Sequence, residues 1–428
     1  MNYDQALAYV DGHIGLGVQP GLERITNLLD LMGRPQEGYP IIHVAGTNGK
    51  TSTSRLATLI LVAHGLTTGT FTSPHLERIE ERLAVNGRIS TQEEFALAIT
   101  DVAAFADLRE GAGEAPNTYF ELTTAAAFAF FADQAVNAGV LEVGMGGRLD
   151  STNVVEAEVC VVTSIGVDHT EFLGEDIRQI AGEKLAIAGL GSILVTGELP
   201  DDALDEARLK ARELGIQHRR FGRDFAVEEY ERGVGGWLAT FRGAESTYED
   251  IFLPLHGRYQ LDNFAIDVAS AEALVGRKLD VEALQDAAAV ATAPGRMEPL
   301  ASSPFVMVDG AHNADAVETL VASLEEEYPT TKWQLLLGVM GDKNIDLMVE
   351  HFSPLLTGVI TTAVDNKRAV PAVELAQQVS KVIPDVPVVP SENVEFGLDM
   401  ARAEAGGDGA VLVAGSIYLV GEVRKLLT

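Results

Sequence analysis

The sequence contains few cysteine and few aromatic residues. Its 428 residues include a single cysteine, Cys160, so an internal disulfide and a cysteine metal cluster are excluded. We expect Cys160, in the apolar run 159–162, to be a small core residue. Only 6% of the residues are aromatic, whereas 46% are hydrophobic and 42 are glycine. This composition is typical of an α/β protein, and the length favours two domains.

Positive charge is scarce as well. Lys and Arg number 31 against 63 Asp and Glu, which gives a formal net charge of -32. Such a balance disfavours non-specific binding to nucleic acid or to an anionic membrane. We expect most acidic side chains to solvate the surface, so an anionic substrate would require cations concentrated locally.

Long hydrophobic runs are also absent. No apolar run approaches the roughly 20 residues of a membrane-spanning helix. Residues 1–5 lack the basic patch and apolar core of a signal peptide. We therefore expect a cytoplasmic protein with no nucleic-acid and no membrane partner.

The most informative segment that is present is 41–52. Its apolar first part leads into a small-residue loop ending Gly49-Lys50-Thr51, and a helix-compatible stretch follows. This order suits a nucleotide's phosphates: backbone N–H groups and the helix dipole face the anion, Lys50 reaches the terminal phosphates, and the Thr51 hydroxyl can bind Mg²⁺. The usual motif has a glycine where this chain has Val44. The string by itself therefore leaves open an ordinary strand-to-helix turn.

Alternating strand and helix patterns predict two mostly parallel sheets. In the first part of the chain we expect strands at 41–45, 68–72, 140–143, 159–163 and 193–196, and helices at 52–63, 91–106, 123–137, 262–275 and 281–290. Residues 203–247 are polar and dotted with aromatic residues, which predicts a small antiparallel part. After a Pro-Gly linker at 293–296, we expect strands at 305–308, 333–339, 359–362, 386–389 and 411–414. The prediction is an α/β protein with an N-terminal P-loop ATPase domain over residues 1–295 and a smaller C-terminal Rossmann-like α/β domain over residues 296–428.

Polar residues follow three further strands of the first domain, where open parallel sheets place their ligands. Glu142 lies in an apolar run before a Gly-rich turn, and Mg²⁺ bound by Thr51 would give its carboxylate a partner; the alternative is a solvent-facing Glu on an edge strand. His169 follows the strand of Cys160 and is either a metal or phosphate contact or a structural histidine. Ser73, before Pro74, either completes a magnesium site or marks a plain turn.

The second domain has a comparable strand end. The predicted strand 305–308 runs into Asp309, followed by a glycine turn with His312 and Asn313 at a helix start. This order suits a nucleotide or carboxylate contact. The alternative is a helix cap by Asn313 and a turn formed by Asp309.

Taken together, these motifs resemble the folylpolyglutamate synthase and dihydrofolate synthase family, within the ATP-dependent Mur ligase superfamily. The resemblance covers essentially the whole chain, and the family's own phosphate loop is the short form seen here. The matching strings, in order, are HVAGTNGKTST (43–53), SPHL (73–76), LEVGMGGRLDSTN (141–153), SIGVDHTEFLG (164–174), GRYQLDNFA (257–265), PGRME (294–298) and DGAHN (309–313).

The resemblance implies a role for each matching residue. It implies ATP contacts by Thr47, Asn48, Gly49, Lys50, Thr51, Ser52, Asn263, Arg296 and Asp309. It implies that two magnesium ions are held by Thr51, Ser73, Glu142 and His169, with Glu142 shared between them. It implies a carbamylated Lys184, which the local pattern alone would make an exposed helix residue. Substrate contacts are implied for Ser73, Pro74, His75, His312 and Ser416, and catalytic roles for Lys50, Glu142, His169, Lys184 and His312.

The activity implied is an ATP-dependent ligation. ATP would phosphorylate the carboxylate of dihydropteroate or the γ-carboxylate of a folate, and L-glutamate would then attack the acyl phosphate to form an amide. We expect a monomer with both activities. The alternatives are a folylpolyglutamate synthase alone, a P-loop nucleotide-dependent binding protein, and a catalytically dead relative.

Overall fold

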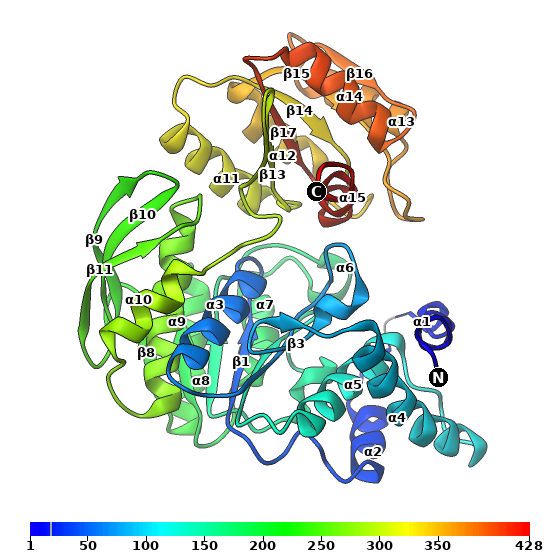
Figure 1. Cartoon of the computed structure of the whole chain (residues 1–428), viewed down its shortest axis with the longest axis vertical. Coiled ribbons are helices and arrows are strands. Elements are labelled where there is room, and N and C mark those ends of the chain that lie inside the picture. The colour runs from blue at the N-terminus through cyan, green and yellow to red at the C-terminus, as the bar shows by residue number, and fades with distance from the viewer. Residues whose placement is uncertain (18) are drawn as a thin grey trace. The chain divides into compact units, whose positions relative to one another are not determined.

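A computed structural model describes residues 1–17 and 19–428 (Figure 1). These residues form two compact units, each described here by itself. The first comprises 1–254 and 261–291, and the second comprises 255–260 and 292–428. The sequence pattern gives no sign that the short segment 255–260 belongs to the second unit. The division into functional domains at residue 295 stays a prediction.

The first unit is built on an eight-stranded sheet with the strand order β4-β3-β2-β5-β1-β6-β7-β8. From β2 to β8 all neighbours are parallel, whereas β3 and β4 extend the sheet as antiparallel strands. The strands are β1 (Ile41–Ala45), β2 (Thr68–Phe71), β3 (Leu83–Val85), β4 (Arg88–Ile89), β5 (Ala138–Glu142), β6 (Val159–Val162), β7 (Ile193–Thr196) and β8 (Gln217–Arg220). The carboxyl ends of β1, β2, β5 and β6 therefore meet at one edge of the sheet, as the sequence predicts.

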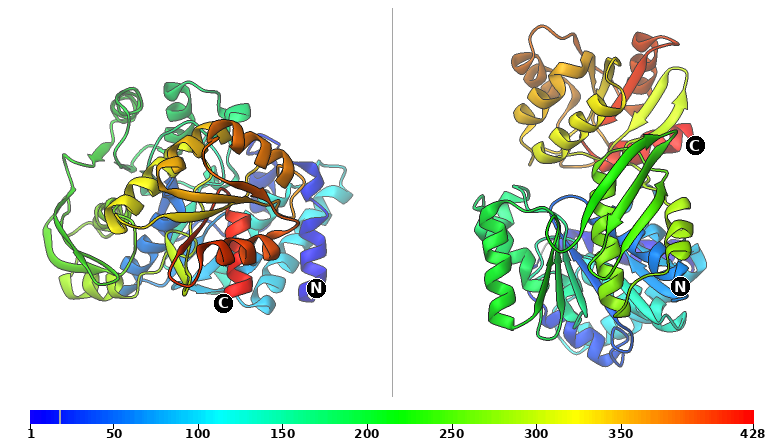
Figure 2. Two further views of the ribbon diagram at one scale, coloured as in Figure 1. Left: turned by 90° about the horizontal axis from the view of Figure 1, so that it is seen from above. Right: turned by 90° about the vertical axis from the view of Figure 1, so that its left-hand side faces the viewer.

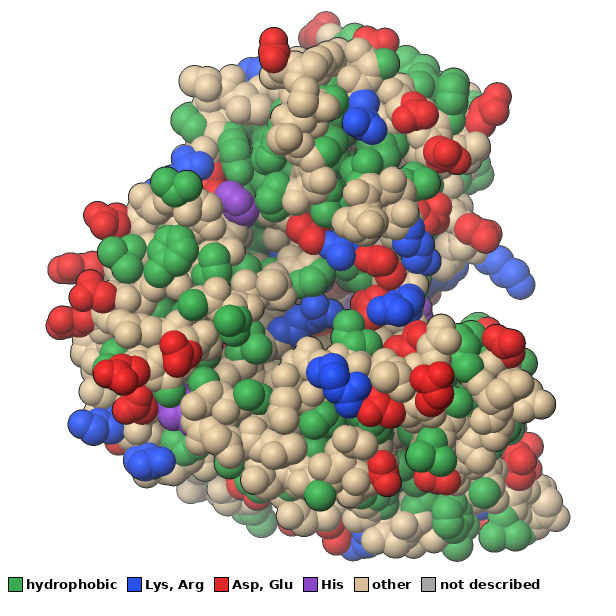
Figure 3. Space-filling view, in the orientation of Figure 1, with side chains coloured by type: hydrophobic (Ala, Val, Ile, Leu, Met, Phe, Trp, Pro, Cys, Tyr) green, Lys and Arg blue, Asp and Glu red, His purple; other side chains and the backbone are tan. Residues whose placement is uncertain are grey.

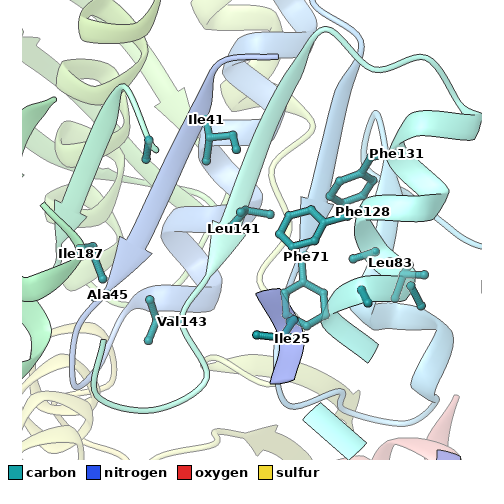
Figure 4. Packing of buried hydrophobic residues seen from close by; sticks show 14 of the residues in the cluster. Ile25, Ile41, Ala45, Phe71, Leu83, Phe128, Phe131, Leu141, Val143 and Ile187 are labelled. Atoms are coloured by element: carbon teal, nitrogen blue, oxygen red, sulfur yellow. The ribbon is translucent and has the colours of Figure 1, made fainter. Parts of the chain in front are cut away.

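Helices cover both faces of this sheet (Figure 2). One face packs against α1 (Tyr3–Asp11), α2 (Glu23–Leu31), α4 (Gln92–Gly111), α5 (Tyr119–Asp133), α7 (Ile177–Lys184) and α8 (Asp201–Leu214). The core between them is aliphatic and aromatic, with Phe71, Phe128 and Leu141 close together (Figure 4). Against the other face lies α3 (Lys50–Ala63), which packs on β1, β2 and β5 and carries α10 (Val281–Ala289).

The first unit contains further helical elements. They are α6 (Thr170–Leu173), α9 (Tyr259–Val275), and the 3₁₀ turns η1 (Ile14–Leu16), η2 (Ile79–Arg82), η3 (Ser151–Val154) and η4 (Leu185–Ile187). The first two residues of α9 fall in the second unit. Capping boxes begin two helices of the first unit: Thr91 pairs with Glu94 at α4, and Thr118 pairs with Glu121 at α5.

A three-stranded antiparallel sheet is present, but its predicted bounds, 203–247, are wrong. It consists of β9 (Ala226–Gly233), β10 (Gly236–Arg242) and β11 (Thr247–Leu253). The first part of the predicted range is instead α8 and the parallel strand β8. The fully buried residues of helix α8 are three alanines four apart, Ala203, Ala207 and Ala211, and Leu214 at its end packs against the same core while partly buried. A buried face made mostly of alanine gives a weak apolar signal of the helical period.

The second unit contains a six-stranded sheet with the order β12-β13-β17-β14-β15-β16. Its strands are β12 (Glu298–Ser302), β13 (Phe305–Val308), β14 (Trp333–Leu337), β15 (Leu356–Thr361), β16 (Val388–Pro390) and β17 (Ala410–Ala414). The helices are α11 (Ala314–Glu327), α12 (Ile345–Phe352), η5 (Ser353–Leu355), α13 (Ala372–Val382), α14 (Val394–Ala405) and α15 (Ile417–Leu427). The edge strand β12, which pairs antiparallel with β13, was not among the predicted strands.

The predictions about acidic side chains and about membrane-spanning helices can be compared with the structure. Acidic side chains are scattered over the face shown in Figure 3 rather than gathered in one patch. Among the described helices, none is both long and apolar enough to cross a membrane.

Candidate functional site

The loop between β1 and α3 has the geometry of a phosphate-binding loop. Gly46 and Gly49 take φ values of 155° and 86°, which L side chains rarely adopt. A Cβ atom on Gly46 would lie 1.9 Å from Oγ1 of Thr163, and one on Gly49 would lie 2.8 Å from Oδ1 of Asn263. Both glycines are therefore required, and the Asn263 side chain lies against the loop. Lys50 is the first residue of α3, so the N-terminal N–H groups of that helix face the loop.

Hydrogen bonds tie this loop to the segment that follows β6. The amide of Thr47 donates to Ser164 O at 2.9 Å, and the amide of Asn48 donates to Ser164 Oγ at 2.9 Å. The hydroxyl of Thr163 donates to Asn48 O at 2.6 Å. The hydroxyl of Thr47 both donates to Gly166 O and accepts from Gly166 N–H. Thr163 and Ser164 were not predicted as site residues, although both stand at the polar strand end that drew attention to His169.

Two lysine ammonium groups share one carbonyl of the loop. Lys50 Nζ donates to Gly46 O at 3.1 Å and to Thr47 O at 3.2 Å, and Lys184 Nζ donates to Gly46 O at 2.9 Å. Lys184 is 4% exposed, so the local pattern that made it a surface residue is wrong. Burial, together with the charge of Lys50, lowers the pKa of Lys184 to about 7. Positive charge is thus concentrated at this loop despite the acidic chain.

Glu142 joins the phosphate loop to the end of β2. Its Oε1 accepts from the Thr51 hydroxyl at 2.8 Å, and its Oε2 accepts from the Ser73 amide at 3.1 Å. β5 lies between β2 and β1, and Glu142 is 1% exposed, so the edge-strand alternative is wrong. The Ser73 hydroxyl is buried and makes no hydrogen bond to any residue that the structure describes. A buried carboxylate beside two hydroxyls, one without a partner, offers the hard oxygen ligands that Mg²⁺ prefers.

His169 stands at the start of α6, on the segment that also carries Ser164 and Gly166. Its φ of 52° is left-handed, and its side chain is half-buried. Over residues 1–17 and 19–428, no three His, Cys, Asp or Glu side chains form a group that could hold a metal. A metal beside Glu142 would therefore depend on hydroxyl ligands as well.

The remaining residues predicted in the first unit lie around this site. Ser52 is buried in the first turn of α3. Pro74 follows Ser73 through a cis peptide bond. Nδ1 of His75 accepts from Nε of Arg82 at 3.1 Å, and the Arg82 guanidinium lies 5.3 Å from the centre of the Tyr119 ring. His75 is thus held in a defined orientation, by a partner that the sequence did not indicate.

A buried polar chain lies behind the site and was not predicted. His43 Nε2 lies 2.8 Å from the Thr152 hydroxyl, which donates to Asp150 Oδ1 at 2.6 Å. Because that hydroxyl gives its proton to Asp150, His43 must donate from Nε2. The other carboxylate oxygen of Asp150 accepts from the Met145 amide at 3.0 Å. The chain links β1 to the Gly-rich loop after Glu142, and burial lowers the pKa of His43 to about 3, so the ring stays neutral.

In the second unit, Asp309 organises the polar residues after β13. Its Oδ2 accepts from the Met297 amide at 2.8 Å, and its Oδ1 accepts from the Ala311 amide at 2.7 Å. Burial raises the pKa of this carboxyl, against the opposing effect of the Arg296 charge. A Cβ atom on Gly310 would lie 2.4 Å from Nη1 of Arg296, so the guanidinium rests on that glycine.

His312, Asn313 and Ser416 lie beside this turn. His312 Nδ1 is 2.8 Å from Gly310 O. Asn313 caps α11, as the structural alternative predicted, and Ser416 caps α15 with its own hydroxyl. The amide of Gly415 donates to Ala311 O at 2.9 Å, which brings Ser416 next to the Asp309 turn.

Comparison with known proteins decides the family. Residues 44–271 match the Mur ligase middle domain, and residues 295–417 match the Mur ligase, glutamate ligase domain. The dihydrofolate synthase/folylpolyglutamate synthase of Mycobacterium tuberculosis is 34% identical over 439 residues, which covers 96% of this chain and 90% of that protein. The chain belongs to the folylpolyglutamate synthase/dihydrofolate synthase family. The resemblance found in the sequence motifs is confirmed.

Solved structures of this family agree with the fold over the whole chain. Folylpolyglutamate synthase of M. tuberculosis, complexed with ADP, superposes with a TM-score of 0.95 at 33% identity, covering 100% of this chain and 99% of that one. Escherichia coli FolC, in complex with DHPP and ADP, has a TM-score of 0.88 at 30% identity, covering 100% of this chain and 97% of that one. The predicted fold class, a mostly parallel α/β architecture with a small antiparallel sheet, is confirmed.

Proposed function

We propose that this chain is a bifunctional dihydrofolate synthase and folylpolyglutamate synthase. In this proposal it joins L-glutamate to dihydropteroate and to the γ-carboxylate of reduced folates, at the expense of ATP. One observation carries the proposal: a buried carboxylate, Glu142, receives hydrogen bonds from both Thr51 of the phosphate loop and Ser73. Residues 1–295 would act as the ATP-binding domain and residues 296–428 as the glutamate ligase domain.

The reaction has two steps. The substrate carboxylate attacks the γ-phosphorus of ATP, and ADP leaves with the electrons of the broken P–O bond. The amine of glutamate then attacks the acyl phosphate carbon, inorganic phosphate leaves, and the nitrogen loses a proton to give the amide. The first step brings two anions together, so it needs fixed positive charge. Lys50 and the N–H groups at the start of α3 supply that charge from this chain, with contacts expected from Thr47, Asn48, Gly49 and Ser52.

The residues around Glu142 fit magnesium. Thr51, Ser73 and Glu142 supply oxygen ligands, and the Ser73 hydroxyl is buried without a hydrogen-bond partner among the described residues. We propose that these three residues and His169 hold two ions, with Glu142 shared. When bound, magnesium neutralises charge on the transferring phosphoryl group.

We also propose that Lys184 is carbamylated. Its neutral amine would add to the carbon of CO₂ and release a proton, which converts a buried cation into an anion. The depressed pKa of Lys184, about 7, leaves a substantial neutral fraction near physiological pH. An anion at this position would support the second magnesium ion.

The residues of the second unit complete the assignment. Arg296 and Asp309, with Asn263 of the first unit, would contact the nucleotide. His312 and Ser416, with Ser73, Pro74 and His75 of the first unit, would contact the carboxylate substrates. We propose that the active enzyme is a monomer, which light scattering of the purified protein tests directly.

The deciding experiment measures ADP release with dihydropteroate and, separately, with tetrahydrofolate, each with and without L-glutamate. Glutamate-dependent release with both acceptors is expected. Release with tetrahydrofolate alone would leave only the folylpolyglutamate synthase activity. ADP release that depends on neither glutamate nor acceptor would refute the proposed ligase activity and favour a nucleotide-dependent binding protein.

A matched pair of variants ties the activity to the site. Glu142→Gln keeps the size of the side chain but removes its charge, and we expect a loss of roughly 10²-fold or more in kcat. Glu93→Gln makes the same change on the exposed surface of α4 and should leave kcat unchanged. Equal activity in the two variants would contradict the proposed site.

A further inference from the structure

The Gly-rich loop after Glu142 also packs against the end of helix α7, which carries Lys184. A Cβ atom on Gly147 would lie 2.6 Å from Glu183 O and 3.0 Å from Lys184 O. The φ angle of Gly147 is not in the left-handed region, so the constraint is steric rather than conformational. The loop thus passes over the carbonyl end of α7 at a distance that only glycine permits.

Arg148 fastens the same contact with three hydrogen bonds. Its amide donates to Glu183 O at 3.0 Å, and its Nε donates to Glu183 Oε1 at 2.8 Å. Its Nη2 donates to Gly182 O at 3.2 Å. Carbonyls in the last turn of a helix lack intrahelical partners, and a cation placed there interacts favourably with the helix dipole. Arg148 therefore caps α7 immediately before Lys184.

The end of α7 determines where the Lys184 ammonium group lies. Lys184 is the last residue of the helix, and its Nζ donates to Gly46 O at 2.9 Å from a nearly fully buried position. The aliphatic part of a buried side chain has little freedom to compensate for a shift of its backbone. A displacement of the α7 end would consequently move the amine relative to Gly46, the first glycine of the phosphate loop.

We propose that Arg148 is a positioning residue, which together with Gly147 fixes the end of α7 and so holds the Lys184 amine against the phosphate loop. The same loop begins directly after Glu142, so one short segment sets both the carboxylate and the amine of the site. The effect of Arg148 on catalysis rests on the proposed function. The effect of Arg148 on the phosphate loop is independent of the proposed function.

The test compares two pairs of variants in the full-length protein. Arg148→Ala removes the two side-chain hydrogen bonds of the cap and keeps the one from the backbone amide. Arg178→Ala removes ion pairs to Asp202 and Glu206 from an arginine of α7 itself whose side chain is exposed to a similar extent. Gly147→Ala places a methyl group against the helix end. Gly182→Ala places one on α7 itself, with nothing within 4 Å.

The first readout is hydrogen–deuterium exchange of the Thr47 and Asn48 amides, which are bonded to Ser164. Arg148→Ala and Gly147→Ala should speed exchange of these amides roughly tenfold, the scale on which loss of outer-shell support acts at functional sites. Arg178→Ala and Gly182→Ala should stay within about twofold of wild type. A role confined to local structure would speed exchange only at 144–150 and 177–187.

Kinetics and a double variant complete the test. Arg148→Ala should lower kcat roughly tenfold, with Arg148→Lys intermediate, and should leave KM for the folate unchanged. In a Lys184→Met background, Arg148→Ala should have no further effect on loop exchange, since its effect passes through the amine. Wild-type exchange at Thr47 and Asn48 in both Arg148→Ala and Gly147→Ala overturns the inference, as does a full effect of Arg148→Ala without Lys184. Absence of ligase activity in the wild-type protein would refute the proposed function but not this inference.

Discussion

Replacement of Lys184 by methionine should make the first unit more stable near neutral pH. The folded-state pKa of Lys184 is about 7, against an ordinary value of 10.5. Between these values the unfolded chain binds more protons than the folded one, so wild-type stability rises with pH across this window. Below about pH 7 both states carry the proton, and folding bears the full cost of burying the charge.

The size of the effect follows from the shift. At about 1.4 kcal/mol for each tenfold change, the drop in the pKa of Lys184 corresponds to about 5 kcal/mol. Methionine has a similar shape and no charge, but it loses the bond to Gly46 O, worth about 1 kcal/mol. We expect Lys184→Met to be more stable than wild type by up to about 4 kcal/mol at pH 6, and less stable by about 1 kcal/mol above pH 10.5.

Urea denaturation from pH 6 to pH 10, in bicarbonate-free buffer, measures this difference. The chain has two tryptophans, of which Trp237 lies in the first unit and Trp333 in the second. In a Trp333→Phe background, fluorescence therefore follows the first unit alone. Lys278→Met, on an exposed lysine, is the control and should parallel wild type. If Lys184→Met also parallels wild type over the whole range, the argument from burial is refuted.

Three further changes have definite expected results. Gly46→Ala should abolish ATP binding in a nucleotide titration, because its Cβ would overlap the Thr163 hydroxyl; binding within tenfold of wild type would contradict the loop geometry. Thr152→Val should destabilise the first unit in urea by roughly 1–3 kcal/mol, since buried His43 loses its partner and Asp150 loses one of its donors, whereas Thr152→Ser should not. Asn313→Ala should cost the second unit about 1 kcal/mol, followed by Trp333 fluorescence; Asn313→Asp should restore the cap, and failure to do so would exclude capping.

Local pattern was sufficient for much of the fold. The strands at 41–45, 193–196 and 305–308 are found where apolar runs are bounded by turn residues, because such runs are buried on both faces of a parallel sheet. Cys160 is buried in the core as expected. Pattern failed at α8, whose fully buried residues are all alanine, and at β12, whose pairing is antiparallel.

The candidate site was predicted in part for the same reason. Glu142, Ser73 and the phosphate loop follow strands of one parallel sheet, and their carboxyl ends must share an edge. Which of these residues touch depends on strand order, which no local pattern specifies. Only the position of β5 between β2 and β1 makes Glu142 a buried partner of Thr51 rather than a surface acid.

Sequence alone thus determined the elements, the polar strand ends and the family, because these depend on neighbouring residues and on motif order. The tertiary structure decided burial and partnership over long separations. The local sequence pattern predicts Lys184 to be a surface residue. In the structure it is buried and its ammonium group donates to the carbonyl of Gly46, 138 positions away along the chain. The Arg148 cap and the His43–Thr152–Asp150 chain likewise exist only once distant segments pack together, since hydrogen bonds depend on distance in space rather than along the chain.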